Sequence, residues 1–274
     1  MKVIITENYE ELSKVAYEEV MKQVVTSNPN AILGLATGSS PIGTYQNMAK
    51  DHRENGTSYK EVVSVNLDEY VGLTADHDQS YAYFMYENLF KNIDIPLANT
   101  NLPSGSAKDL AAECDRYNAL LEEYQQDVQV LGLGSNGHIG FNEPGTPFGS
   151  VTHLVDLAES TIKDNSRLFA SIDEVPRQAL SMGIKNIMNA KSILVVVSGK
   201  NKAAAVYGMV KGEVTPNLPA SVLQLHPAVT VICDKDPLKF PYIKKAELND
   251  VVIFATEASA FEVVGKLYEL GIGK

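Results

Sequence analysis

Four clusters of polar residues each follow a short apolar run, and each contains side chains that could take part in chemistry. In chain order they are Thr37-Gly38-Ser39-Ser40-Pro41, Asp68-Glu69-Tyr70, the glycine-rich stretch 134–144, and Ser198-Gly199-Lys200-Asn201-Lys202. Together they offer a small-residue loop for an anion, a pair of carboxylates, a histidine near a glutamate, and cations. This combination is typical of acid–base catalysis on a small, negatively charged substrate.

The first cluster has the composition of a phosphate-binding loop. Gly38 lets the backbone approach an anion, and the amides at the start of the following helix attract negative charge. The hydroxyls of Ser39 and Ser40 could add donors, and Arg167 and Lys202 are candidate cations for the same phosphate. A tight turn with a capping serine is the alternative for the loop, and solvated charges are the alternative for the cations. No Gly-Lys-Ser/Thr follows, so the loop is not a Walker A motif.

A histidine and a glutamate lie close together in the glycine-rich stretch. A carboxylate beside an imidazole orients the ring and raises its pKa, so His138 with Glu143 could donate a proton near neutral pH. Asn136 could hold a ligand oxygen or the ring. A structural, hydrogen-bonded histidine is the alternative, but a position on a glycine-rich loop after a strand favours a functional role.

Residues 132–137 match the GxGxxG fingerprint of dinucleotide-binding folds. That fingerprint has to open a helix directly, and here Pro144 and Pro147 interrupt the stretch that follows. We therefore reject the dinucleotide interpretation. Instead, we expect the glycines to let a tight loop carry His138 over a ligand.

Two carboxylates, Asp68 and Glu69, directly follow an apolar run. A carboxylate in this place is partly removed from water, which raises its pKa towards the range of a general base. A helix cap or a solvated turn is the alternative. The histidines form no HxH or HxxxH pair, so we expect no metal site.

The elements that must position these residues can be read from the hydrophobic pattern. Runs of Val, Ile and Leu without polar alternation indicate strands that are buried on both faces. Strands are predicted at 3–6, 31–36, 62–67, 128–133, 193–197, 229–233 and 251–255. Helices are predicted after an Asn8 cap, at 41–50 with Ser40 as cap, and at 107–126, 201–211 and 257–269.

The alternation of strands and helices predicts an α/β fold with a doubly wound, mostly parallel sheet. The chain has no repeat and no obvious linker, so we expect a single domain over residues 1–274. Residues 144–170 leave the sheet and begin rich in Gly, Pro, Ser and Thr. We expect this excursion to form a flap over the site.

Composition limits the classes of function. The 274 residues carry a formal net charge of −11, which argues against nucleic acid as the main partner. The two cysteines, Cys114 and Cys233, form no CxxC motif and fit a reducing compartment. The N-terminus lacks a signal-peptide pattern, and no apolar run approaches the roughly 20 residues of a membrane helix. We therefore expect a cytoplasmic protein that is not inserted in a membrane.

Several long motifs resemble one family. TGSSP, NLDEYVGL, the run GLGSNGHIGFNEP, NSRLFA at 165–170 and LQLHP at 223–227 closely resemble isomerising glucosamine-6-phosphate deaminases. The likeness extends over most of the chain. It implies a modified Rossmann-like fold and conversion of glucosamine 6-phosphate and water into fructose 6-phosphate and ammonia, with no cofactor.

The resemblance also implies roles for the candidate residues. Asp68 matches the base that moves a proton between C2 and C1 of the substrate. His138 matches the residue that assists opening of the sugar ring, with Glu143 and Asn136 as its partners. The phosphate pocket is matched by Gly38, Ser39, Ser40, Arg167 and Lys202, although Lys200 could take the place of Lys202.

Two departures from the hexameric, allosteric branch of that family affect the expectations. That branch has an aspartate at the position of Asn136, so the proton relay here should depend more on Glu143. It also uses basic residues soon after the NEP motif to bind an activator, N-acetylglucosamine 6-phosphate, whereas this chain has Thr152-His153-Leu154-Val155 there. We expect no such activation, and a monomer or small homo-oligomer rather than the hexamer.

Three alternatives stay open at this point. A galactosamine-6-phosphate deaminase and a 6-phosphogluconolactonase could use the same scaffold, although the Asp-Glu-Tyr and Phe-Asn-Glu-Pro segments favour the deaminase. A non-catalytic domain that senses a sugar phosphate would need the phosphate pocket and no acid–base pair. The net charge, together with a chain that starts directly on its first strand, argues against such a sensor.

Overall fold

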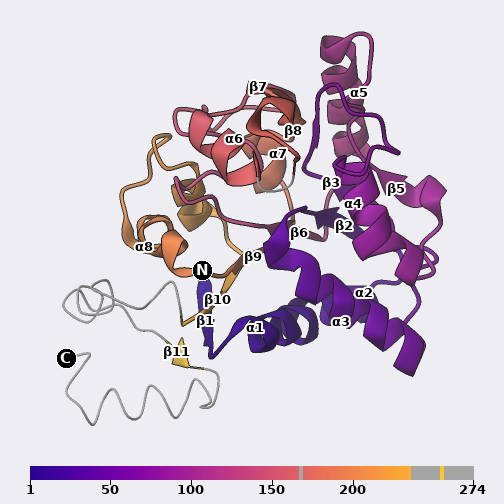
Figure 1. Cartoon of the computed structure of the whole chain (residues 1–274). Helices are drawn as coiled ribbons and strands as arrows, with labels where there is room; N and C mark the ends of the chain where they lie inside the picture. The colour runs from indigo at the N-terminus through magenta and orange to yellow at the C-terminus, as the bar shows by residue number, and fades with distance from the viewer. Residues whose placement is uncertain (167–168, 236–253, 256–274) are drawn as a thin grey trace, which may run out of the picture.

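The computed structural model describes residues 1–166, 169–235 and 254–255 (Figure 1). Within this part of the chain, parallel strands form a central sheet. They are β1 (Lys2–Thr6), β2 (Ile32–Leu35), β3 (Val63–Asn66), β5 (Thr100–Asn101), β6 (Val128–Leu131), β9 (Ile193–Val197), β10 (Val229–Asp234) and β11 (Phe254–Ala255). Their order across the sheet is β11-β1-β10-β9-β6-β2-β3-β5.

The strand order reverses between β2 and β6. From β2 the chain adds β3 and β5 on one side, and from β6 it adds β9 and β10 on the other, where β1 and β11 complete the sheet. This is the doubly wound arrangement that the sequence predicts, and ligands of such sheets bind beyond the carboxyl ends of the strands at the reversal point. The loops that follow β2 and β6 are the TGSSP loop and the glycine-rich stretch, so both meet there.

All seven apolar runs contain a strand. Every residue of β6 and of β9 is buried, as expected for strands covered on both faces. Of the predicted strand at 251–255, the structure describes the last two residues, which form β11 and pair with β1. The predicted helix at 257–269 lies outside the described residues.

Helices cover both faces of the sheet. They are α1 (Tyr9–Ala16), α2 (Lys22–Ser27), α3 (Ser39–Asn55), α4 (Tyr81–Asn88), α5 (Leu110–Glu123), α6 (Glu159–Asn165), α7 (Ile184–Met188) and α8 (Ala203–Lys211). Figure 1 shows α1, α2 and α3 grouped together, with α6, α7 and α8 on the other side of the sheet. The predicted Asn8 cap is confirmed, because its side chain accepts a hydrogen bond from the amide of Glu11 at 2.9 Å.

The predicted start of α3 is wrong by two residues. Its first residue is Ser39 rather than Pro41, and the cap is Gly38 rather than Ser40. Gly38 has φ 93°, a left-handed conformation that glycine adopts without strain. That conformation turns the chain into the helix earlier, so both serines belong to the first turn.

A second, antiparallel sheet is absent from the sequence prediction. It has three strands in the order β4-β8-β7: β4 (Asp68–Tyr70), β8 (Gln178–Ser181) and β7 (His153–Asp156). These strands are short and rich in polar residues, so they carry no apolar pattern. The excursion at 144–170 contains β7 and α6.

The second sheet covers a small hydrophobic core of its own. Its buried members are Tyr70, Phe141, Val155, Leu157, Ile162, Val175 and Ala179. This core joins β4, which begins at Asp68, to the excursion and to the loop after β6. This core therefore packs against the strand that carries a candidate catalytic residue.

We expect Gly105→Ala to destabilise the fold by displacing β4. A Cβ atom at this glycine would lie 1.8 Å from the carbonyl oxygen of Tyr70, a backbone atom that cannot move without its strand. The loss should be about 1–3 kcal/mol, or roughly 2–6 °C in Tm. Thermal unfolding followed by circular dichroism measures it. Gly149→Ala is the matched control, because its Cβ would enter open space; an equal Tm for the two variants would contradict the prediction.

Candidate active site

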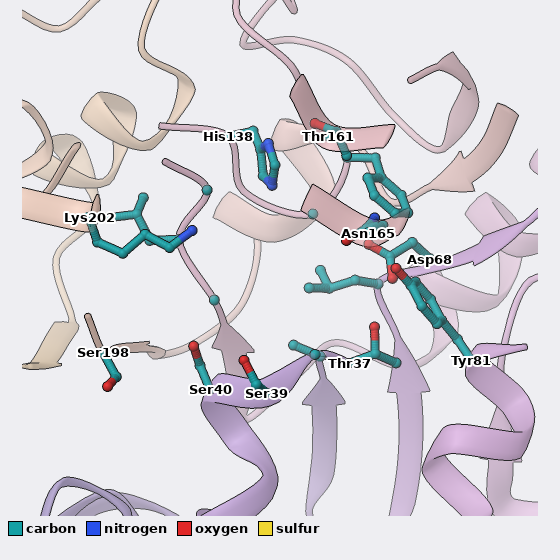
Figure 2. Close-up of a pocket in the computed structure, with 18 of the residues that line it drawn as sticks. Thr37, Ser39, Ser40, Asp68, Tyr81, His138, Thr161, Asn165, Ser198 and Lys202 are labelled. Atoms are coloured by element: carbon teal, nitrogen blue, oxygen red, sulfur yellow. The ribbon is translucent and has the colours of Figure 1, made fainter. Parts of the chain in front are cut away.

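A cavity of about 480 Å³ lies beyond the carboxyl ends of β2, β3 and β6. Figure 2 shows its lining: Ser39 and Ser40 lie at the start of α3, Lys202 points in from one end, and Asp68 and Tyr81 lie at the other end. His138 points in from the loop after β6. The cavity volume suits a small ligand such as a sugar phosphate.

The start of α3 lines the cavity through Ser39 and Ser40. No side chain of the described residues caps the helix, so the amides of its first turn are not occupied by a cap. The hydroxyl of Tyr9 donates to the carbonyl of Ser39 at 2.7 Å and accepts from the amide of Gly43 at 2.9 Å. Tyr9 thereby holds the first turn from behind and leaves the cavity side open.

The structure distinguishes the two candidate lysines. Lys202 lines the cavity and Lys200 does not, although both belong to one 3-10 turn (Lys200–Lys202) after β9. Among the Lys and Arg residues that the structure describes, Lys202 alone lines the cavity. Arg167, the other predicted cation, lies outside the described residues.

Asp68 is a buried carboxylate that faces the cavity. It is the first residue of β4, and its residue is 6% exposed. No described residue donates a hydrogen bond to its carboxylate. Burial raises the pKa of Asp68 to about 8, and the neighbouring charge of Glu69 contributes to the same shift. The side chain therefore has the burial and the basicity of a general base, which agrees with the sequence prediction.

Glu69 has a different position from Asp68. Its carboxylate accepts hydrogen bonds from the amides of Tyr81 and Ala82 at 2.9 Å each, and from the amide of Tyr70 at 2.8 Å. Two of these amides begin α4, so the helix-cap alternative holds for Glu69. Burial still leaves its pKa raised, despite the three hydrogen bonds.

His138, Glu143 and Asn136 are brought together as the sequence predicts. The Nδ1 atom of His138 lies 3.4 Å from Oε2 of Glu143. Asn136 donates from Nδ2 to the same Oε2 at 2.7 Å, and its Oδ1 accepts from the amide of His138 at 3.1 Å. Asn136 therefore links the backbone of the His138 loop to the Glu143 carboxylate, because a side-chain amide can donate and accept hydrogen bonds at the same time.

A glycine of the GxGxxG match makes room for the imidazole. A Cβ atom at Gly134 would lie 2.6 Å from the ring of His138. The loop closes through hydrogen bonds from the amide of Gly134 to the carbonyl of His138 and from the amide of Gly137 to the carbonyl of Gly134. The described residues 132–152 contain no helix, so this loop does not open one, as a dinucleotide-binding fingerprint requires.

Three cavity residues are missing from the sequence prediction: Tyr81 of α4, and Thr161 and Asn165 of α6. Asn165 donates to the hydroxyl of Tyr70 at 2.8 Å, and the ring of Tyr81 packs on Tyr70 with centroids 4.7 Å apart. Asn165 begins the NSRLFA segment, and this motif is the one sequence signal that could have identified it as a site residue. Tyr81 and Thr161 belong to no motif, and only the tertiary fold brings them to the cavity.

Two further searches cover the same described residues. They contain no group of three or more His, Cys, Asp or Glu side chains arranged to hold a metal ion. None of their helices combines the length and apolar character that crossing a membrane requires.

Fold and site together define a class: an α/β protein of the Rossmann-like type whose cavity is lined by a helix start, a buried carboxylate and a histidine. The chain belongs to the family of glucosamine-6-phosphate isomerases and 6-phosphogluconolactonases, whose model matches residues 7–232. The resemblance found in the sequence motifs is thereby confirmed.

Individual relatives are more specific. The chain is 52% identical to a glucosamine-6-phosphate deaminase of Geobacillus sp. (strain WCH70), over 87% of this chain and 95% of that protein. It is 50% identical to one from Clostridium perfringens, over 87% of this chain and 99% of that protein.

Solved structures agree with this assignment. A monomeric glucosamine-6-phosphate deaminase superposes with a TM-score of 0.86 at 45% identity, over 88% of this chain and all of that one. A 6-phosphogluconolactonase from Trypanosoma brucei has a TM-score of 0.70 at 21% identity, over 87% of this chain and 97% of that one, and shares the fold alone.

We expect Asp68→Asn to stabilise the protein at alkaline pH. The folded-state pKa of Asp68, about 8, lies above its ordinary value of 3.8. Between these values the folded state holds a proton that the unfolded state has released, so stability falls as pH rises through the window. The variant lacks this titration.

Its Tm should exceed that of the wild type by roughly 2–6 °C at pH 8 and by little near pH 4.5. Differential scanning calorimetry across pH measures the difference. Asp115→Asn, at an exposed position, serves as the control. A Tm difference that is independent of pH would contradict the prediction.

Proposed function

We propose that this protein is an isomerising glucosamine-6-phosphate deaminase, which converts glucosamine 6-phosphate and water into fructose 6-phosphate and ammonia. The observation that carries the proposal is the meeting, in one cavity, of a buried carboxylate, a histidine that is paired with Glu143 behind it, and an anion-binding helix start. The names of relatives that share about half of their residues with this chain support the same reaction.

The phosphate of the substrate binds at the start of α3. Gly38, which has no side chain, lets the phosphate approach the backbone. The amides of the first turn and the hydroxyls of Ser39 and Ser40 donate hydrogen bonds to the phosphate, and Lys202 adds a positive charge. Arg167 completes this group in the proposal, on the strength of the sequence resemblance. Binding at this end directs the sugar towards Asp68 and holds the flexible open chain in place.

Ring opening is assigned to His138. The imidazole protonates the ring oxygen as the bond between that oxygen and C1 breaks, and the C1 hydroxyl releases its own proton to water as it becomes the aldehyde. Glu143 stabilises the charged form of the imidazole. Hydrogen bonding and charge from His138, with hydrogen bonds from Thr161 and Asn136, outweigh burial and hold the pKa of Glu143 below its ordinary value. Glu143 therefore stays ionised beside the imidazole.

Isomerisation is assigned to Asp68. The carboxylate takes the proton from C2 and delivers it to C1, and the absence of hydrogen-bond donors from the described residues keeps it basic. The amine on C2 becomes an imine, water adds to that carbon, and ammonia leaves. The nitrogen of the substrate is itself the leaving group, so these steps need no cofactor.

The phosphorylated substrate also supports the cytoplasmic location expected from the sequence. A sugar phosphate is charged and does not cross a membrane unaided. The enzyme that consumes the sugar phosphate therefore has to be in the compartment where the sugar phosphate is formed.

We expect ammonia release from glucosamine 6-phosphate by the wild type, without added metal or nucleotide. Asp68→Asn should lower kcat by about 10²–10⁴-fold, because the proton can no longer be taken from C2. A coupled ammonia assay measures both proteins, with Asp115→Asn as the matched control of unchanged activity.

The same assay separates the alternatives. Faster ammonia release from galactosamine 6-phosphate would reassign the sugar, and hydrolysis of 6-phosphogluconolactone in place of ammonia release would reassign the reaction. Binding of the sugar phosphate without turnover, equal in wild type and Asp68→Asn, would favour a sensing domain.

The oligomeric state is part of the proposal. We infer a monomer or small homo-oligomer without allosteric activation, supported by the lack of Lys and Arg at 152–155 and by the likeness to a deaminase described as monomeric. The rate should depend hyperbolically on glucosamine 6-phosphate. A sigmoidal curve that N-acetylglucosamine 6-phosphate makes hyperbolic, or a hexamer in analytical ultracentrifugation, would overturn this expectation.

A further inference from the structure

Both carboxylate oxygens of Glu143 are occupied. Oε2 accepts from Asn136 at 2.7 Å and lies 3.4 Å from His138 Nδ1, while Oε1 accepts from the hydroxyl of Thr161 at 2.5 Å. The side chain of Glu143 is 13% exposed and Thr161 is 5% exposed. A largely buried carboxylate is held in one orientation when Asn136 donates to one of its oxygens and Thr161 donates to the other.

Thr161 brings α6 into this arrangement. Asn165 follows four residues later, on the same face of the helix, and donates to the hydroxyl of Tyr70 at 2.8 Å. Both side chains line the cavity, and Figure 2 shows Thr161 beside His138 and Asn165 beside Asp68. One face of α6 therefore contacts both the Glu143 carboxylate and the hydroxyl of Tyr70.

We propose that Thr161 is a positioning residue for ring opening, because its hydroxyl sets the orientation of the Glu143 carboxylate towards His138. This inference rests on the proposed deaminase function and deepens it. It makes the proton relay dependent on α6, which belongs to the excursion and not to the central sheet. No motif in the sequence connects Thr161 with Glu143.

The physical effect of the hydroxyl is twofold. It fixes the rotation of the carboxylate so that Oε2 faces His138, and it stabilises the ionised form of Glu143. Without it, Oε1 loses its donor, the carboxylate becomes free to turn away from His138, and the pKa of Glu143 rises. Among the described residues, His138 is the titratable group in contact with Glu143, and the nearby Lys163 of α6 is exposed.

The test compares Thr161→Val, Thr161→Ser and Thr146→Val with the wild type. Thr146 also donates to Glu143, at 2.7 Å, but to its backbone carbonyl, so Thr146→Val is a matched control that leaves the carboxylate untouched. Thr161→Val should lower kcat for glucosamine 6-phosphate by about tenfold, with Thr161→Ser and Thr146→Val within about twofold of the wild type.

Two further readouts separate positioning from a merely structural role. In Thr161→Val the acidic limb of kcat/KM should move to higher pH, because Glu143 loses one of the hydrogen bonds that lower its pKa. Binding of the open-chain alditol phosphate, obtained by reducing the substrate at C1, should stay unchanged, because this molecule has no ring to open.

Failure of the proposed deaminase function and failure of the proposed Thr161 role give different results. If the wild type releases no ammonia, the proposed function fails. If the wild type is active and Thr161→Val keeps its kcat and pH profile, the positioning role fails alone. A drop in kcat with lowered Tm, weaker binding of the alditol phosphate and an unmoved pH limb also overturns it, because that pattern belongs to a general loss of structure.

Discussion

The hydrogen bonds from three backbone amides to Glu69 are the interaction on which the rest of the site depends. The sequence places two carboxylates side by side at the end of an apolar strand, and the fold buries both. Two buried, unsatisfied carboxylates would be costly. The amides of Tyr70, Tyr81 and Ala82 satisfy Glu69, fix β4 and begin α4. Asp68 can then remain without donors from the described residues, available for a substrate.

The burial of Asp68 carries a cost in stability that its proposed chemistry explains. A base that accepts a proton from carbon has to be poorly solvated, and poor solvation destabilises the ionised form. The small core around Tyr70, Phe141 and Val155 holds the strand in place against that cost. The second sheet therefore holds the Asp68 carboxylate in position.

The two acid–base groups are built in opposite ways. Asp68 is left without hydrogen bonds from described residues and has a raised pKa, whereas Glu143 accepts from Asn136 and Thr161 and has a lowered pKa. The two carboxylates thus differ by environment alone, which separates their proposed roles. Asparagine at position 136 fits this division, since its amide donates to Glu143 where a second carboxylate would repel it.

The sequence by itself determined the parallel sheet and the residues at its carboxyl edge. Strands buried on both faces must be apolar throughout, and polar residues at their ends must meet at one edge, which placed Ser39, Asp68 and His138 in advance. Tertiary structure decided what depends on contacts between distant segments: the antiparallel sheet of short polar strands, and the arrival of Tyr81, Thr161 and Asn165 at the cavity. It also decided that Glu69 caps a helix while Asp68 faces the cavity. Adjacent residues of a strand point to opposite faces, and only the packing of each face reveals which one meets the ligand.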